Sequence, residues 1–194
     1  MIASVCAMAM LPGVVTVRSA AATETGGLGG AAPAARGARL WVSRYGGPGN
    51  AGADASAMAV SPAGGAVYVT GSSTGVRHGM DYATAAYDAA TGAQLWASRY
   101  VGPSNERDLP TSMAVSPDGG TVFVTGFGTG DLPGSQDYVT VAYNAATGAQ
   151  LWAERYNGPG NGDDRATSMA VSPEMGPPVR RTPNLASLTN GRQR

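Results

Sequence analysis

The 194-residue chain is long enough to fold as one domain around a hydrophobic core. Its 13 acidic and 13 basic residues balance, and charged side chains make up only 13% of it, so no basic field is present to attract nucleic acid. Glycine is frequent, at 29 residues, and 13 prolines lie between runs rich in Val, Thr, Tyr and Ala. This pattern predicts many short strands joined by tight turns.

The N-terminal segment has the composition of an export signal. Residues 1–17 are almost wholly apolar, and small residues follow at 19–22. They predict a signal peptide over 1–22 and a secreted, periplasmic or cell-surface protein. The alternative is a buried first strand or helix, because no Lys or Arg precedes the apolar run. Cys6, the only cysteine, would leave with the signal, and the Gly- and Ala-rich stretch 23–38 is expected to be a linker.

The rest of the chain repeats itself. Leu-Trp occurs at 40–41, 95–96 and 151–152, so that the tryptophans are 55 and then 56 residues apart. An Arg three residues later, a Tyr four residues later and a Met-Ala-Val-Ser-Pro run accompany each copy. A period of this length is typical of stacked repeats, in which each unit buries its faces against its neighbours.

Each unit predicts four strands. In the first unit they are 56–60, 66–71, 82–87 and 94–100, and in the second 111–115, 121–126, 138–143 and 150–156. The first strand of each unit is short and mostly apolar, which predicts an inner strand buried on both faces. Ser-Pro-Ala-Gly-Gly and Ser-Pro-Asp-Gly-Gly supply turns after it. Four antiparallel strands per stacked unit indicate the blade of a β-propeller, with a β-solenoid as the alternative.

We therefore predict an all-β partial β-propeller over 39–173, with two complete four-stranded antiparallel blades and a single strand at each end. These flanking strands are expected at 39–45 and 166–171. The third copy breaks after Pro173, where adjacent prolines cannot donate ladder hydrogen bonds. Residues 174–194 hold four Arg and one acid and are predicted to be a disordered basic tail, which a frameshift or a fragment end in the gene would explain.

One recurring segment resembles the tryptophan-docking motif of quinoprotein, or PQQ-like, propellers. It reads Ala-x-Asp-x-x-Thr-Gly-x-x-x-Trp, the second copy has Asn in place of Asp, and only the Trp end of the first copy is present. The resemblance implies that each Trp ring packs between neighbouring blades and locks them together. The residues to which it gives this structural docking role are Ala86, Asp88, Thr91, Gly92, Trp96, Ala142, Asn144, Thr147, Gly148, Trp152 and Trp41.

Because the motif is structural, it implies no cofactor, and related propellers of the repeat-only kind have no known catalytic activity. We expect a non-catalytic, extracytoplasmic module for binding or scaffolding that is a truncated piece of a longer propeller. PQQ or calcium is expected only in a full-length relative. The alternative is a fragment of a quinone-dependent dehydrogenase or another propeller enzyme. Expected partners are a protein or a surface ligand, together with self-association through open blade faces, and not nucleic acid or a membrane span.

No catalytic, cofactor-binding or metal-binding residue is predicted. Acidic residues gather before each inner strand, at Asp54, at Glu106 and Asp108, and at Asp163 and Asp164. They could ligate calcium, but their spacing differs between copies and favours turn capping.

Three further features also favour structural roles. Asp81 and Asp137 are expected to cap the backbone at the start of a strand. The single histidine, His78, is expected to be an exposed loop residue. The glycine-rich run 126–130 resembles a phosphate loop only superficially, since it precedes a strand and not a helix.

Overall fold

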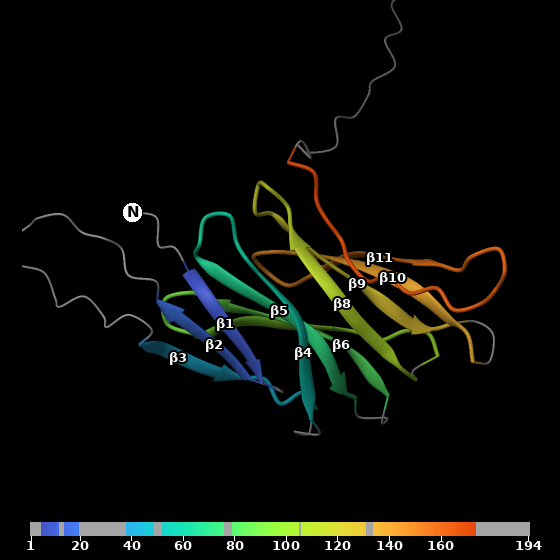
Figure 1. Ribbon diagram of the computed structural model, residues 1–194, viewed down its shortest axis with the longest axis horizontal. Helices are drawn as coiled ribbons and strands as arrows, with labels where there is room; N and C mark the ends of the chain where they lie inside the picture. Colours follow the sequence, from blue (N-terminus) through green and yellow to red (C-terminus); the bar gives the residue numbers. More distant parts are fainter. Residues whose placement is uncertain are drawn as a thin grey trace, which may run out of the picture.

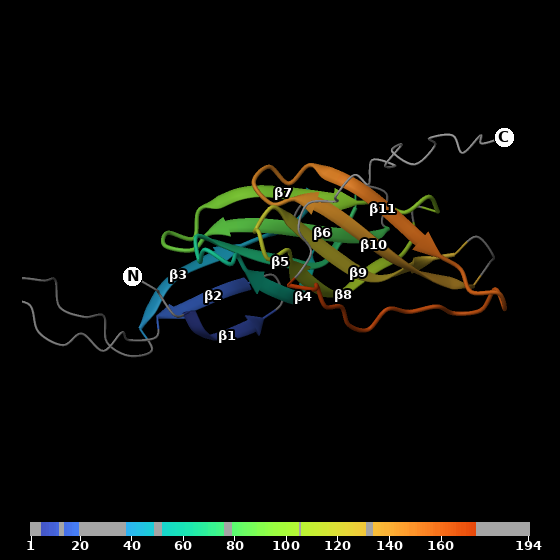
Figure 2. The same cartoon turned by 90° about the horizontal axis from the view of Figure 1, so that it is seen from above.

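The computed structural model describes residues 5–11, 14–19, 38–48, 52–75, 79–104, 106–130 and 134–173. The regular elements in these ranges are β-strands, and they form three antiparallel sheets. The three sheets follow one another along the long axis of the molecule (Figures 1 and 2). The predicted all-β partial propeller is thereby confirmed.

Two four-stranded sheets form the blades. Blade 1 has the order β4-β5-β6-β7 and blade 2 the order β8-β9-β10-β11, so each blade is a simple meander. The strands of blade 1 are β4 (Ala53–Val60), β5 (Ala66–Thr74), β6 (Met80–Asp88) and β7 (Gln94–Tyr100). Those of blade 2 are β8 (Asp108–Val115), β9 (Thr121–Thr129), β10 (Gln136–Asn144) and β11 (Gln150–Tyr156).

The third sheet lies at the N-terminal end and pairs β1 (Val5–Leu11), β2 (Val14–Ser19) and β3 (Arg39–Arg44). The flanking strand expected at 39–45 is therefore present as β3 but is not single, because β2 pairs with it over Val14 to Arg18. The signal peptide over 1–22 stays a prediction. Its removal would take β1 and β2 away and leave β3 unpaired on that side.

All eight predicted blade strands are present, and six of them are longer than predicted. β4, β6, β8 and β10 begin two to three residues earlier in their Gly- and Asp-containing loops, and β5 and β9 end three residues later. Ladder pairing with the neighbouring strand extends them. The expectation that the first strand of each blade is buried on both faces is wrong for blade 1. β4 is an edge strand with alternating exposure, whereas β5 and β6 are buried along nearly their whole length.

The strand expected at 166–171 is not formed. This part of the chain is extended without a ladder, although the Thr111 hydroxyl on β8 donates a hydrogen bond to the carbonyl of Ala166 at 2.7 Å. The predicted tail over 174–194, the linker over 23–38 except for its last residue, and the loop residue His78 lie outside the described residues.

The turns between the first two strands of each blade use the glycines that the sequence analysis singled out. Gly64 and Gly119 both have a φ of 74°, a conformation that residues with a side chain rarely adopt. Each donates its N–H, at 2.8 Å, to the carbonyl of the Ser that opens the turn. In blade 2 the Asp118 carboxylate also accepts a hydrogen bond from the Gly120 N–H at 2.9 Å. Blade 1 has Ala63 at this position, whose side chain cannot accept such a bond.

The main hydrophobic core lies between the two blades. Blade 1 contributes aromatic side chains to it, and blade 2 contributes mainly Val, with Met113, Tyr143 and Ala145. A second, smaller cluster joins Trp41 of β3 to the opposite face of blade 1. The sheets are thus held together face to face by apolar side chains, as expected for stacked blades.

Candidate functional site

The predicted docking residues meet at two junctions, and the first joins β3 to blade 1. The Trp41 indole N–H donates a hydrogen bond to the Ala89 carbonyl at 3.0 Å, and the Ser43 hydroxyl donates one to the Gly92 carbonyl. The ring lies flat against the turn, because a Cβ at Gly92 would be only 2.5 Å from Cδ2 of Trp41. Gly92 also has a φ of 74°, so two independent constraints require glycine there.

The second junction repeats the first between blade 1 and blade 2. The Trp96 indole N–H donates to the Ala145 carbonyl at 2.9 Å, and the Ser98 hydroxyl donates to the Gly148 carbonyl at 2.5 Å. A Cβ at Gly148 would lie 2.6 Å from the Trp96 ring. The Tyr68 hydroxyl shares the Ala145 carbonyl at 3.4 Å. A tryptophan on the last strand of one sheet therefore docks on the last turn of the next sheet.

The predicted motif is consequently divided between two junctions. Its Ala, Asp, Thr and Gly residues shape the turn that binds the Trp of the preceding sheet. Its own Trp extends toward the position of the following blade. Ala86 pairs directly with Trp96 across the ladder, as Ala142 does with Trp152, and both alanines are fully buried.

The Asp or Asn at the third position holds this receiving turn in shape. The Asp88 carboxylate accepts hydrogen bonds from Ala90 N–H at 3.1 Å, from Thr91 N–H at 2.8 Å and from the Thr91 hydroxyl at 2.7 Å. These bonds, with the Thr91 hydroxyl first, lower the pKa of the Asp88 carboxyl below its ordinary value. In blade 2 the Asn144 amide oxygen accepts the same three bonds at 3.0 to 3.1 Å. The replacement of Asp by Asn therefore preserves the turn.

The third tryptophan does not dock within the described part of the chain. Trp152 is 41% exposed, whereas Trp41 and Trp96 are each 8% exposed. Its ring contacts Phe123 of its own blade at a centroid distance of 6.0 Å. The same residue in the same motif is thus buried or exposed according to whether a receiving turn follows it.

Each blade also contains an ion pair between its last two strands. Arg99 binds Asp81 and the oxygens of Ser73, and Arg155 binds Asp137 at 3.0 Å. The carboxylates are almost fully buried. The expectation that Asp81 and Asp137 cap the backbone is therefore wrong. The recurring Arg three residues after each Trp was the available signal, but its partner, 18 residues earlier, can be identified only from the strand register.

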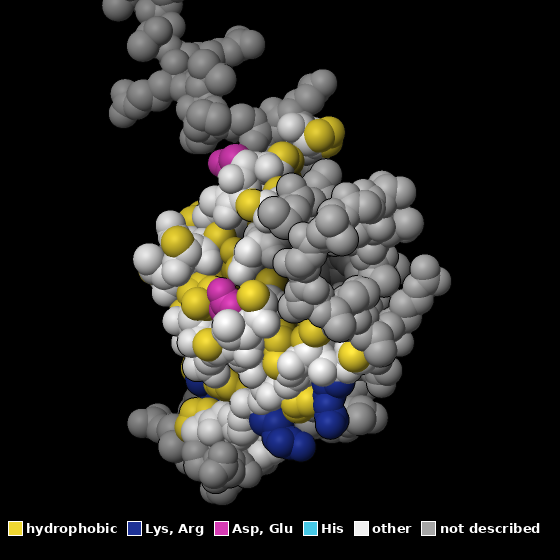
Figure 3. Space-filling view, turned by 90° about the vertical axis from the view of Figure 1, so that its left-hand side faces the viewer, with side chains coloured by type: hydrophobic (Ala, Val, Ile, Leu, Met, Phe, Trp, Pro, Cys, Tyr) yellow, Lys and Arg dark blue, Asp and Glu magenta, His cyan; other side chains and the backbone are white. Residues whose placement is uncertain are grey.

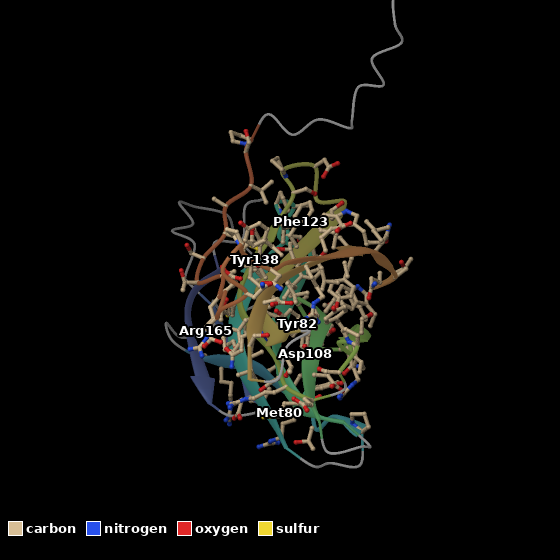
Figure 4. The ribbon with its side chains drawn as sticks, turned by 90° about the vertical axis from the view of Figure 1, so that its right-hand side faces the viewer. Met80, Tyr82, Asp108, Phe123, Tyr138 and Arg165 are labelled. Atoms are coloured by element: carbon tan, nitrogen blue, oxygen red, sulfur yellow. The ribbon has the colours of Figure 1, made fainter. Side chains whose placement is uncertain are left out.

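Two of the five acids before the inner strands, Asp108 and Asp164, cap loops, in agreement with the favoured expectation. The Asp108 carboxylate accepts the Gly102 N–H, and the Asp164 carboxylate accepts the Gly158 N–H, both at 2.6 Å. Burial raises the pKa of the Asp108 carboxyl, which lies near Tyr82 between the blades (Figure 4). Asp163 instead pairs with Arg165 at 2.9 Å on the surface.

The glycine-rich run 126–130 is not a phosphate loop. Most of it lies within β9, where glycine permits close approach. A Cβ at Gly126 would be 2.1 Å from the Leu109 carbonyl oxygen and 2.6 Å from the Tyr82 hydroxyl, and one at Gly128 would be 2.1 Å from Oδ1 of Asp108. These glycines thus make room for the neighbouring strand and for a tyrosine of blade 1.

Metal ligands do not cluster in the described residues: no three His, Cys, Asp or Glu side chains there are arranged to hold an ion. In the same ranges no helix is long and apolar enough to cross a membrane. The recurring residues build the junction between blades, which binds an indole ring and orders two sheets.

These junctions define the class of protein, a β-propeller repeat protein assembled through tryptophan docking. The family model PQQ_2, described as "Outer membrane protein assembly factor BamB", matches residues 80–177, which is just over half of the chain. The chain belongs to this family of PQQ-like propeller repeats, as the sequence resemblance predicted. No curated protein matches it.

Because Trp96 is buried and Trp152 is exposed, replacing each by alanine should lower the free energy of unfolding by very different amounts. Trp96→Ala removes a buried ring and its hydrogen bond, and should lower the free energy of unfolding by about 3–5 kcal/mol. Trp152→Ala is the matched control in the same motif position and should lower it by about 1 kcal/mol or less, because its ring is already partly in water. Urea unfolding followed by circular dichroism measures both. Equal losses would contradict the assigned junctions.

The Asp88 carboxylate of the first receiving turn predicts that the stability of the fold depends on pH, and exchanging Asp and Asn between the two turns should change which blade carries this dependence. Because the folded-state pKa of Asp88 is lowered, its stabilising effect is complete above the unfolded pKa of about 4 and is lost as the pH falls through the folded value. Asp88→Asn keeps the acceptor and should flatten the acid side of the stability curve. Asn144→Asp should add such a slope. Thermal midpoints between about pH 2 and pH 6 test this, and unchanged curves for both variants would refute it.

Proposed function

We propose that this chain is a non-catalytic, extracytoplasmic propeller module that binds or scaffolds other polypeptides. The observation that carries the proposal is how the recurring polar residues are used. The recurring Asp, Arg, Thr and Ser side chains are bonded within turns, loops and junctions, so the parts of the sequence that repeat serve assembly.

The family model supports the same class of function. Its description names an outer membrane protein assembly factor, a role in which one protein acts on other polypeptides outside the cytoplasm. The predicted signal over residues 1–22 agrees with such a location. The view that the chain is a piece of a longer propeller is part of this proposal, and it is supported by the exposed docking tryptophan at 152.

The alternative function, a fragment of a quinone-dependent dehydrogenase, predicts that quinone and calcium bind. Titration of the folded chain with PQQ in the presence of calcium, read by tryptophan fluorescence, should show no saturable change at micromolar concentrations. N-acetyltryptophanamide is the control for light absorbed by the quinone. Saturable quenching beyond that control would favour the dehydrogenase alternative over the proposal.

The scaffolding function itself predicts binding of an unfolded polypeptide. An outer-membrane β-barrel protein diluted from urea should aggregate more slowly when the chain is present, in proportion to its concentration. An unfolded soluble enzyme serves as the control substrate, and static light scattering is the measurement. If the β-barrel protein aggregates at the same rate with and without the chain, the scaffolding proposal fails.

A further inference from the structure

Blade 1 presents four aromatic side chains to blade 2, and all of them are buried there. They are Tyr68, Tyr82, Trp96 and Tyr100, and none is more than 9% exposed. Tyr82 reaches furthest: its hydroxyl lies over Gly126 and donates to the Val139 carbonyl at 3.5 Å. At the junction, the aromatic rings of blade 1 thus pack on the facing side of blade 2, and Gly126 lies opposite the Tyr82 ring.

Blade 2 carries the equivalent set on its outer side, which we term the aromatic face: Phe123, Tyr138, Trp152 and Tyr156. The last three are 36%, 41% and 46% exposed. Phe123 and Trp152 lie 6.0 Å apart, close to the 5.9 Å between Tyr68 and Trp96, and Tyr138 stacks on Tyr156 at 4.8 Å. Phe123 and Tyr138 can be located in Figure 4. Phe123 and Trp152 therefore have the spacing of the docked pair, whereas Tyr138 and Tyr156 are stacked and Tyr82 and Tyr100 meet edge to face at 5.6 Å. Residues 164–166 lie along one part of this face, where Arg165 packs over Phe127, the cross-strand neighbour of Tyr138.

The matching surface is the opposite side of blade 1, which we term the receiving face. It contains a hollow lined by Tyr45, Val69, Gly71, Ala83, Ala85 and Tyr87. Gly71 and Ala83 occupy the positions that Gly126 and Val139 hold in blade 2, so the hollow corresponds to the seat of the Tyr82 hydroxyl. Hydrophobic side chains reach the surface on the side of the molecule that carries β3 and β4 (Figure 3).

Within one chain, the sheet β1-β2-β3 stands on the side of the receiving face, and β3 is its strand with described side chains. It supplies Trp41 to the turn and Tyr45 to the edge of the hollow, which are two of the four aromatic positions. Smaller side chains also line this hollow than line its counterpart, because Ala83 and Ala85 stand where blade 2 has Val139 and Val141. The described lining of the hollow therefore leaves more room for a ring than the seat of Tyr82 in blade 2 does.

We propose that the aromatic face of one copy docks on the receiving face of a second copy, in place of the sheet β1-β2-β3 and with residues 164–166 of the first copy moved aside. Tyr138 enters the hollow between Gly71 and Ala83, and Trp152 takes the turn that Trp41 holds in the single chain. The interface repeats the junction between blades 1 and 2, so it is head-to-tail and not two-fold symmetric. Such an interface builds a closed ring or an open row of copies.

The test uses two variants, each of which blocks one side of the interface. Tyr138→Glu places a charge in the aromatic face, and Ala55→Arg fills the hollow from a half-exposed position at its rim. Leu151→Glu is the matched control: it adds the same charge to an exposed side chain, and its counterpart Leu95 remains 54% exposed although Trp96 beside it is docked. Circular dichroism and thermal midpoints establish that all variants are folded.

Sedimentation velocity over about 1–200 μM is expected to show concentration-dependent association of the unaltered chain and of Leu151→Glu. Each blocking variant alone should weaken association at least tenfold. An equimolar mixture of the two should form a dimer and nothing larger, because each variant retains one intact face. Trp41→Ala, which empties the turn, should strengthen association. An unaltered chain that stays monomeric, or a mixture that stays monomeric, would overturn the proposal.

Discussion

The docking of one indole ring on one glycine turn is the interaction on which the rest of the structure depends. Burial of a tryptophan removes roughly 150–250 Å² from water, equivalent to up to about 4–6 kcal/mol, and the indole N–H adds a hydrogen bond. Neither Trp41 nor Trp96 could lie flat on its turn if Gly92 or Gly148 carried a side chain. Since each ring belongs to one sheet and each turn to the next, this contact makes neighbouring sheets mutually dependent.

The polar groups of the turns, strands and loops support that contact and do not compete with it. Asp88 and Asn144 hold the receiving turns, Arg155 neutralises Asp137 between the last strands, and Asp108 fixes the loop that leads into β8. A buried carboxylate is costly unless it is paired or accepts hydrogen bonds from N–H groups. Side chains engaged in this way hold turns, loops and strand pairs in place, and this is how the recurring polar residues give ordered junctions.

Much of this fold could be predicted from the sequence because turn chemistry and strand alternation are local. The glycines at 64 and 119, the Thr-Gly turns and the predicted strand cores all follow from residue types within a few positions. The ion pair of Asp81 with Arg99 could not, because the register of β6 against β7 brings those residues together. Pairing also lengthened β5 beyond Gly71 and placed β2 beside β3, where propensity alone does not specify a partner.

A repeat fixes the identity of a residue but not its surroundings. Trp96 and Trp152 share the motif, the strand position and the cross-strand alanine, yet only Trp96 has a turn to receive it. In a stacked array, stability resides in the junctions more than in the units, and a terminal unit exposes the surface that an inner unit buries. Large exposed aromatic surfaces favour association. The last described blade therefore differs from the first in its surface although their sequences nearly coincide. Its aromatic rings are exposed, whereas the equivalent rings of blade 1 are buried against blade 2.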